Sequence, residues 1–204
     1  MNEKEIKCIL IDYLMKKYPN GIIAVEVPFL AGQRRVDVML ITENELVAFE
    51  IKSELDSLRR LEGQLIDYQE TFTQVYVILS EKFKQQHSII SLLPQNVGYG
   101  FLKTKSREIC IKRNAKKRTR LSKENLSFFL WRKDLQALGR SNDSANSLRK
   151  KFIKNNSVIM ILAMAIEAIR ARYEIRFNDF KKSKSKYTHL EDLEDLTTTY
   201  GEIF

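Results

Sequence analysis

The fold is decided by residues 34–53, RRVDVMLITENELVAFEIKS, in which two apolar runs flank a short polar stretch. Both runs are rich in β-branched and aromatic residues, which predicts two strands. Three charged residues, Asp37, Glu50 and Lys52, lie within these runs. Because side chains alternate along a strand, Glu50 and Lys52 point to the same face of the predicted sheet. The segment therefore predicts neighbouring strands that present charged groups together.

The flanking segments extend these strands into an α/β sheet domain. Apolar residues spaced three or four apart predict helices on both sides, and further short apolar runs predict more strands. The first three strands are expected to form an antiparallel meander, and the fourth to lie parallel to the third. The expected strands are Ile22–Val27, Val36–Ile41, Leu46–Ile51, Gln74–Leu79, Val97–Leu102 and Glu108–Ile111, and the expected helices are Glu3–Tyr18, Asp56–Phe72 and Glu81–Leu93.

The second half of the chain has a different pattern, with helical stretches and no strand signal. Helices are expected near residues 123–138, 145–154 and 157–177. We therefore divide the chain into a sheet domain at residues 1–112, a basic helical region at 113–185, and an acidic tail at 186–204 that is expected to be mobile or to dock on a basic surface.

Positive charge is concentrated in one part of the chain. Residues 101–154 hold 17 Lys and Arg against four Asp and Glu, a net charge of +13 in a chain whose total is +9. This charge predicts contact with a polyanion, although a solvated basic face is the alternative. The candidate nucleic-acid-binding residues are Lys116, Lys117, Arg118 and Arg120.

The composition excludes several classes of protein. With 44% hydrophobic and 30% charged residues, the chain is expected to fold as a soluble globular protein. Its two cysteines lie far apart, which gives no support for a disulfide framework or a zinc site. The longest apolar run, Val158–Ile166, is too short to cross a bilayer, and the N-terminus is not signal-like. We expect a cytoplasmic protein without membrane contact.

The charged residues on the two strands predict a metal site. A charge at the centre of a sheet needs a compensating partner or ion, because burying it alone is costly. Mg²⁺ or Mn²⁺ between Asp37 and Glu50 would supply that ion. Lys52 is then placed to orient an attacking water or to neutralise charge that develops on a phosphate. Glu-x-Lys alone is frequent on exposed strands, so the acidic residue 13 positions earlier is what favours a site.

Further polar residues are candidates for the same site. Gln64 and Tyr68 are four residues apart on an expected helix and so lie on one side of it, although core packing is the alternative for Tyr68. Glu26 lies near the end of the first expected strand, and Glu3 begins the first expected helix, where acidic residues are favoured in any case. Each of these two acids is a candidate third metal ligand, with a structural role as the alternative.

These residues resemble the signature of the PD-(D/E)XK nuclease superfamily. The helix, three strands, helix and strand expected over residues 3–80 are similar to its core. More closely, the chain is similar to a family of small bacterial proteins with the pattern Arg-Val-Asp, then Glu-Ile-Lys-Ser-x-x-Asp-[Ser/Thr]-Leu-x-Arg-Leu-x-x-Gln-x-x-x-Tyr. The matching residues are Arg35-Val36-Asp37, Glu50-Ile51-Lys52-Ser53, Asp56-Ser57-Leu58, Arg60-Leu61, Gln64 and Tyr68.

The resemblance implies a restriction-endonuclease-like fold, a mixed central sheet flanked by helices, followed here by a basic α-helical C-terminal segment. It implies Asp37, Glu50 and Lys52 as catalytic residues, with Asp37 and Glu50 as metal ligands. Glu3 looks like the acidic residue that the first helix contributes in many members, with Glu5 as the alternative. The spacing of Gln64 and Tyr68 is similar to a motif of the RecB-like branch. Supporting roles are expected for Gln64, Tyr68, Glu26 and Arg35.

The expected function is that of a metal-dependent nuclease that hydrolyses phosphodiester bonds of DNA with Mg²⁺ or Mn²⁺. One alternative is a DNA-binding protein that keeps the nuclease fold without turnover or that needs a partner for activity. The other is an RNA-directed nuclease or toxin. The resemblance covers only the first half of the chain, and Val36 stands where the superfamily name has proline. A homo-oligomer or a partner subunit is compatible with the sequence.

Overall fold

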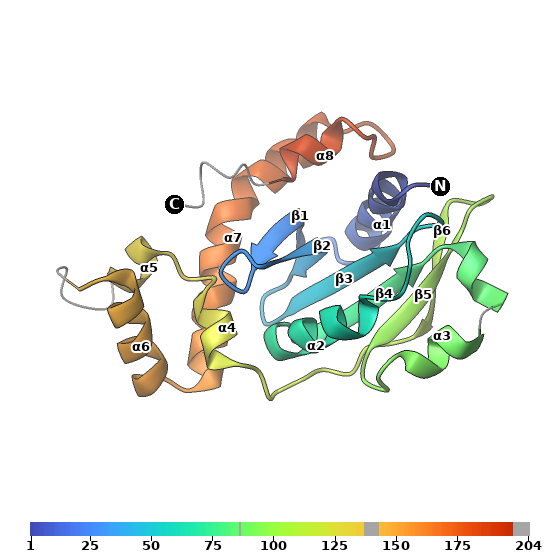
Figure 1. Ribbon diagram of the computed structural model, residues 1–204. Helices are drawn as coiled ribbons and strands as arrows, with labels where there is room; N and C mark the ends of the chain where they lie inside the picture. The colour runs from blue at the N-terminus through green and yellow to red at the C-terminus, as the bar shows by residue number, and fades with distance from the viewer. Residues whose placement is uncertain (86, 137–142, 198–204) are drawn as a thin grey trace.

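The computed structural model describes residues 1–85, 87–136 and 143–197, and its centre is a six-stranded sheet with helices on both faces (Figure 1). The sheet order is β1-β2-β3-β4-β5-β6, so every strand pairs with its neighbour in sequence. The β3–β4 and β4–β5 pairs are parallel and the others antiparallel, which confirms a mixed sheet in an α/β protein. The strands are β1 Ile22–Phe29, β2 Arg34–Ile41, β3 Leu46–Lys52, β4 Gln74–Leu79, β5 Gly98–Lys103 and β6 Glu108–Arg113.

The expected antiparallel meander and the parallel fourth strand are both confirmed. β1 pairs with β2 and β2 with β3 in antiparallel register, and β3 pairs with β4 from Val47–Gln74 to Lys52–Leu79. Every residue of β3 is buried, including its two charged residues, Glu50 and Lys52. A strand covered on both faces reads as an almost continuous apolar run, which is why its sequence identified it.

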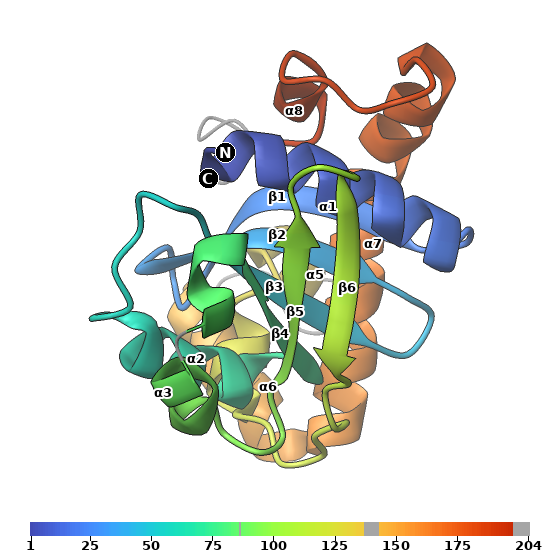
Figure 2. The same ribbon diagram turned by 90° about the vertical axis from the view of Figure 1, so that its right-hand side faces the viewer.

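Two helices cover opposite faces of the sheet near β3 (Figures 1 and 2). The first is α1, Glu3–Lys17, which begins at Asn2 with a capping box completed by Glu5. Asn2 accepts the N–H of Glu5 while Glu5 accepts the N–H of Asn2, so two otherwise unpaired helix donors are satisfied. The second is α2, Leu61–Thr71. The charged residues of β3 lie in the part of the sheet that α1 and α2 cover.

The start of α2 and the segment after β4 differ from the sequence-based expectation. The helix expected from Asp56 begins only at Leu61, because the Asp56 carboxylate accepts the N–H of Ser53 at 2.7 Å and so closes a turn after β3. The expected helix Glu81–Leu93 is two short segments, the 3₁₀ turn η1, Glu81–Gln85, and α3, His87–Leu92.

The second half consists of helices that pack on the sheet domain. Their buried side chains join those of the sheet in one hydrophobic cluster. The longest described helix, α7, runs beside β1 (Figure 1), yet no helix in the described ranges has an apolar stretch long enough to span a membrane. The helices are α4 Lys123–Ser127, α5 Arg132–Gln136, α6 Ala145–Asn155, α7 Val158–Ser183 and α8 Asp192–Asp195.

The described part of the acidic tail, residues 186–197, packs against α1 and β1. The N–H and hydroxyl of Thr188 donate to Asp12 of α1. The N–H of Val25 in β1 donates to the carbonyl of Leu196, whose side chain is buried. The end of the tail, residues 198–204, lies outside the described residues.

Candidate active site

The candidate site lies where strands β2 and β3 diverge. Their pairing runs from Ile41–Leu46 to Val38–Phe49, after which β2 continues beside β1 and β3 beside β4. Asp37 and Glu50 are the first residues beyond this shared ladder. In the gap the N–H of Ile51 donates to the side chain of Asp37, with 2.7 Å between the nitrogen and Oδ2. The fold thus brings the two predicted acidic residues together at the mouth of a fork.

The predicted helix residues reach this fork from α2. Lys52 Nζ donates to Glu50 Oε1 at 2.6 Å and to Gln64 Oε1 at 3.0 Å. The Tyr68 hydroxyl lies 2.6 Å from Glu50 Oε2 and 3.0 Å from the carbonyl oxygen of Arg35. Both oxygens of the Glu50 carboxylate, which is only 2% exposed, therefore have a hydrogen-bond donor.

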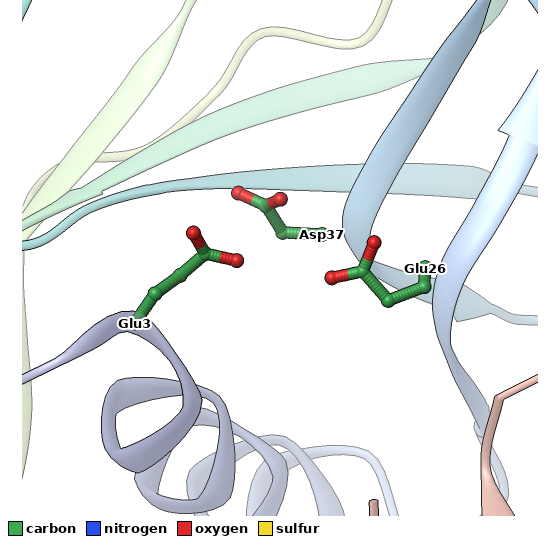
Figure 3. Close-up of side chains that lie close together, drawn as sticks. All are labelled: Glu3, Glu26 and Asp37. Carbon is green, nitrogen blue, oxygen red and sulfur yellow. The ribbon is translucent and has the colours of Figure 1, made fainter. Parts of the chain in front are cut away.

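A group of three carboxylates lies next to this network. One oxygen each of Glu3, Glu26 and Asp37 lie within 4.8 Å of one another. Figure 3 shows the three carboxylates converging between the first turn of α1 and strands β1 and β2. The pairing of β1 with β2 brings Glu26 and Asp37 together, and the packing of α1 across the sheet adds Glu3.

Glu26 adopts an unusual backbone conformation within β1. Its φ angle is +53°, whereas the pairs on either side, Val25–Val38 and Val27–Val36, keep regular register with β2. This register sets Glu26 opposite Asp37. A left-handed φ at a residue other than glycine costs on the order of 1–3 kcal/mol and persists where the surroundings impose it, most often at functional sites. Such strain distinguishes Glu26 from an ordinary strand residue.

Lys7 is a site residue that the sequence analysis missed. It lies one turn after Glu3 on the buried side of α1, and its side chain is almost entirely buried. Its ammonium donates to Glu3 Oε1 at 2.5 Å and also to Glu26 Oε1. The other carboxylate oxygen of Glu26, Oε2, lies 3.6 Å from the Arg35 guanidinium. The signal available in the sequence was a single lysine within the apolar stripe of the first helix, four residues after an acidic one.

Burial and neighbouring charges together shift the pKa values of three groups in the site. Burial raises the pKa of Asp37 well above its usual range, and the charge of Glu50 raises it further, against the opposing effect of Lys7. Burial lowers the pKa of Lys7, but Asp37, Glu26 and Glu3 together raise it above its usual value. Burial and then Glu50 raise the pKa of Tyr68, which keeps its hydroxyl protonated as a donor.

The donor set fits a hard divalent cation. Mg²⁺ and Mn²⁺ prefer carboxylate oxygens and retain water ligands, and a surplus of negative charge favours their binding. Of the metal ligands expected from sequence, Asp37 and Glu3 belong to the group of three carboxylates. The expected supporting residue Glu26 completes that group, and Glu50 is not part of it. An ion at these carboxylates would share Glu3 and Glu26 with the ammonium of Lys7.

The four basic residues expected to bind nucleic acid are placed differently from one another. Lys116 and Arg120 are exposed. Lys117 Nζ lies 3.0 Å from Glu45 Oε1, and Arg118 Nε donates to the carbonyl oxygen of Gln69 at 2.7 Å. Arg118 therefore fastens this segment to α2.

Comparison with known proteins gives a family match over nearly the whole chain. Residues 1–197 match the family described as Bacteriophage P4 protein cII. Protein cII of Enterobacteria phage P4 is 30% identical over 190 residues, which cover 88% of this chain and 71% of that protein. Among solved structures, a protein of unknown function from Silicibacter pomeroyi has a TM-score of 0.44 and 16% identity, covering 92% of this chain and 100% of that one.

Proposed function

The chain belongs to the Bacteriophage P4 protein cII family, and we propose that it is a metal-dependent nuclease that cleaves the phosphodiester backbone of DNA. One observation carries the proposal: Asp37 and the Glu50–Lys52 pair meet where β2 and β3 diverge, beside two further carboxylates. Carboxylates in surplus next to a buried ammonium are suited to hold a divalent cation against a phosphate.

Each residue of the candidate site would have a distinct role. Asp37, with Glu3 and Glu26, would hold Mg²⁺ or Mn²⁺, which when bound polarises phosphate oxygens and lowers the pKa of water. Lys52 places a positive charge where negative charge develops on the phosphate. Glu50 and Gln64 fix the Lys52 ammonium through bonds of 2.6 and 3.0 Å, so it is oriented before substrate arrives. Tyr68 in turn fixes Glu50.

The arrangement of elements also supports a PD-(D/E)XK type of core. The order α1, β1, β2, β3, α2, β4, the antiparallel meander and the parallel β3–β4 pair agree with what the sequence resemblance implies. The sequence resemblance implies an acidic residue on β2 and an acid and a lysine on β3. Asp37, Glu50 and Lys52 occupy those strands.

A second candidate function is DNA binding without turnover, and the position of Lys7 favours it. Its ammonium already contacts Glu3 and Glu26, while both oxygens of Glu50 accept hydrogen bonds from the protein. Carboxylates that already have donors within the protein have less need of a metal ion. The two functions differ in one observable, metal-dependent cleavage.

The test is cleavage by the full chain of supercoiled, linear and single-stranded DNA and of single-stranded RNA, with Mg²⁺, Mn²⁺ or EDTA. We expect metal-dependent cleavage of DNA that is lost in Glu50→Gln. The matched control is Glu62→Gln, which alters an exposed carboxylate on α2 and should cleave normally. Binding without cleavage under every condition would establish the second candidate, and preferential cleavage of RNA would replace DNA as the substrate.

A further inference from the structure

A concave region away from the candidate site is lined by the β1–β2 hairpin, the α4–α5 connection and helices α5, α6 and α7. It is a pocket of about 610 Å³, within the range of roughly 300–1,000 Å³ that is usual for ligand sites. Its described lining contains basic and aromatic side chains and no acidic one. The residues important here are Phe128, Trp131, Arg132, Lys133, Arg149 and Arg172.

Arg149 carries a positive charge that no described carboxylate offsets. Its guanidinium donates to the carbonyl oxygens of Ser127 at 3.3 Å and Leu130 at 3.1 Å, and to Asn146 Oδ1 at 3.3 Å. Burial lowers the pKa of Arg149, and no acidic neighbour opposes this effect. A guanidinium has five N–H donors, so these three bonds leave two for a ligand. A fork of two such donors matches a phosphate.

The aromatic side chains give the pocket apolar surfaces beside this charge. The Arg149 guanidinium lies 4.8 Å from the centre of the Phe128 ring, and the Arg172 guanidinium 4.0 Å from that of Trp131. The charge of Arg172 is offset by Asp134 at 3.0 Å, so Arg172 serves to hold the indole in place. The charge of Arg149 has no such carboxylate among the described residues. Phosphate-binding cations next to an aromatic side chain are the combination that binds single strands, where bases stack on rings.

Packed aromatic side chains link the pocket to the candidate active site. Phe29 at the end of β1 lines the pocket, and its ring packs edge-on against Tyr68 with 5.2 Å between the centroids. Tyr68 is the residue that contacts Glu50. The pocket and the fork at which cleavage is proposed are therefore separated by one layer of packed aromatic side chains.

We propose that this pocket binds one nucleotide unit of single-stranded DNA, with a phosphate on Arg149 and the base against Trp131. The identity of the ligand rests on the proposed function, because a nuclease site beside the pocket makes a nucleic acid its natural occupant. The binding itself needs no metal. It can therefore be tested apart from cleavage.

The test uses Trp131 as the reporter, since it is the only tryptophan of the chain. The full chain in EDTA at fixed salt is titrated with a short single-stranded oligodeoxynucleotide, the same sequence as a duplex, and a mononucleotide. We expect the single strand to change the fluorescence and to bind most tightly. Arg149→Ala should weaken its binding about ten-fold, the effect of one charge-assisted contact. Arg149→Lys keeps the charge and loses the two paired donors, so its affinity should lie between those of the wild type and Arg149→Ala.

The matched control is Lys150→Ala, which removes an exposed charge from the neighbouring position of α6 and should alter binding less than two-fold. Equal losses in the Arg149 and Lys150 variants, unchanged fluorescence at saturation, or equal affinity for the duplex would each overturn the proposal. Specific binding without any metal-dependent cleavage would support the binding pocket and contradict the proposed nuclease function. Metal-dependent cleavage with no effect of Arg149→Ala on binding would support the nuclease function and contradict the binding pocket.

Discussion

The candidate active site and the basic pocket balance their charges in opposite ways. In the active site each buried ammonium contacts a carboxylate, Lys52 with Glu50 and Lys7 with Glu3 and Glu26. In the pocket Arg149 bonds only to carbonyl oxygens among the described residues. Paired buried charges hold one another in place, so removing one leaves the other buried without a partner. An unpaired, partly exposed charge is free to bind an external anion, so removing it should affect binding more than folding.

The largest effect is expected from Lys52→Gln. The substitution leaves the buried Glu50 carboxylate without its cation, which should cost roughly 3–5 kcal/mol of unfolding free energy. It also removes the charge proposed to face the phosphate, so cleavage should fall on the order of 10²–10³-fold. Chemical denaturation measures the first quantity and single-turnover cleavage the second.

The double variant Glu50→Gln with Lys52→Gln separates these effects. It replaces the ion pair by two neutral amides of similar shape, so much of the lost stability should return while cleavage remains absent. If cleavage returned together with stability, Lys52 would be a structural residue and the proposed chemistry would be wrong.

The next effect in size is expected from Lys7→Met. Three carboxylates would lose their shared ammonium, but Glu3 and Glu26 are 40% and 29% exposed. Solvent screening reduces the cost, so we expect a loss of roughly 2–4 kcal/mol in EDTA. Mg²⁺ should restore more stability to this variant than to the wild type, because the ion replaces the missing charge. The control is Lys4→Met on the exposed side of α1. Equal responses to Mg²⁺ would show that Lys7 and the metal do not share ligands.

The sequence predicted the strands of the site well because these residues are buried on both faces. Asp37, Glu50 and Lys52 are conspicuous as charged residues within two apolar runs. Because side chains alternate along a strand, their positions predict which face of the sheet each charge lies on. Glu26 and Lys7 were harder to assign. The left-handed φ of Glu26 comes from its surroundings, and the partners of Lys7 depend on how α1 crosses the sheet. The φ angle of Glu26 has no local sequence pattern, and the one signal for Lys7 was its place in the apolar stripe of the first helix.

The pocket could not be predicted from the sequence at all. It is assembled from the β1–β2 hairpin, the α4–α5 connection, α6 and α7. The total charge of the region indicated a polyanion partner, but the candidate residues came from the run at 116–120 and did not include Arg149. Packing separates them, because Arg118 bonds to Gln69 of α2 while Arg149 lines the pocket. Charge density along a chain therefore locates a surface but not the residues that use it.

A third prediction concerns pH, with a smaller expected effect. The pKa of Asp37 is raised in the folded protein, so the penalty on folding is full above the raised value, shrinks as pH falls below it and is gone at the ordinary carboxyl range. Without metal, the wild type should gain stability on acidification relative to Asp37→Asn, by at most about 1.4 kcal/mol per pH unit. Asp37→Asn should be the more stable protein at neutral pH. Denaturation of both proteins in EDTA across this range tests it, and parallel curves would contradict it.

The smallest predicted change is the most specific to the pocket. Each phosphate neutralised by a cation releases counterions, which gives single-strand binding a slope of about −0.7 in log affinity against log salt. Arg149→Ala should therefore make the slope shallower by about 0.7, the share of one phosphate. Lys117→Ala should change it less, because Glu45 already offsets that charge at 3.0 Å. Binding titrations at four salt concentrations give the slopes. If Arg149→Ala weakened binding without changing the slope, the guanidinium would support the shape of the pocket through its carbonyl contacts and would not hold a phosphate.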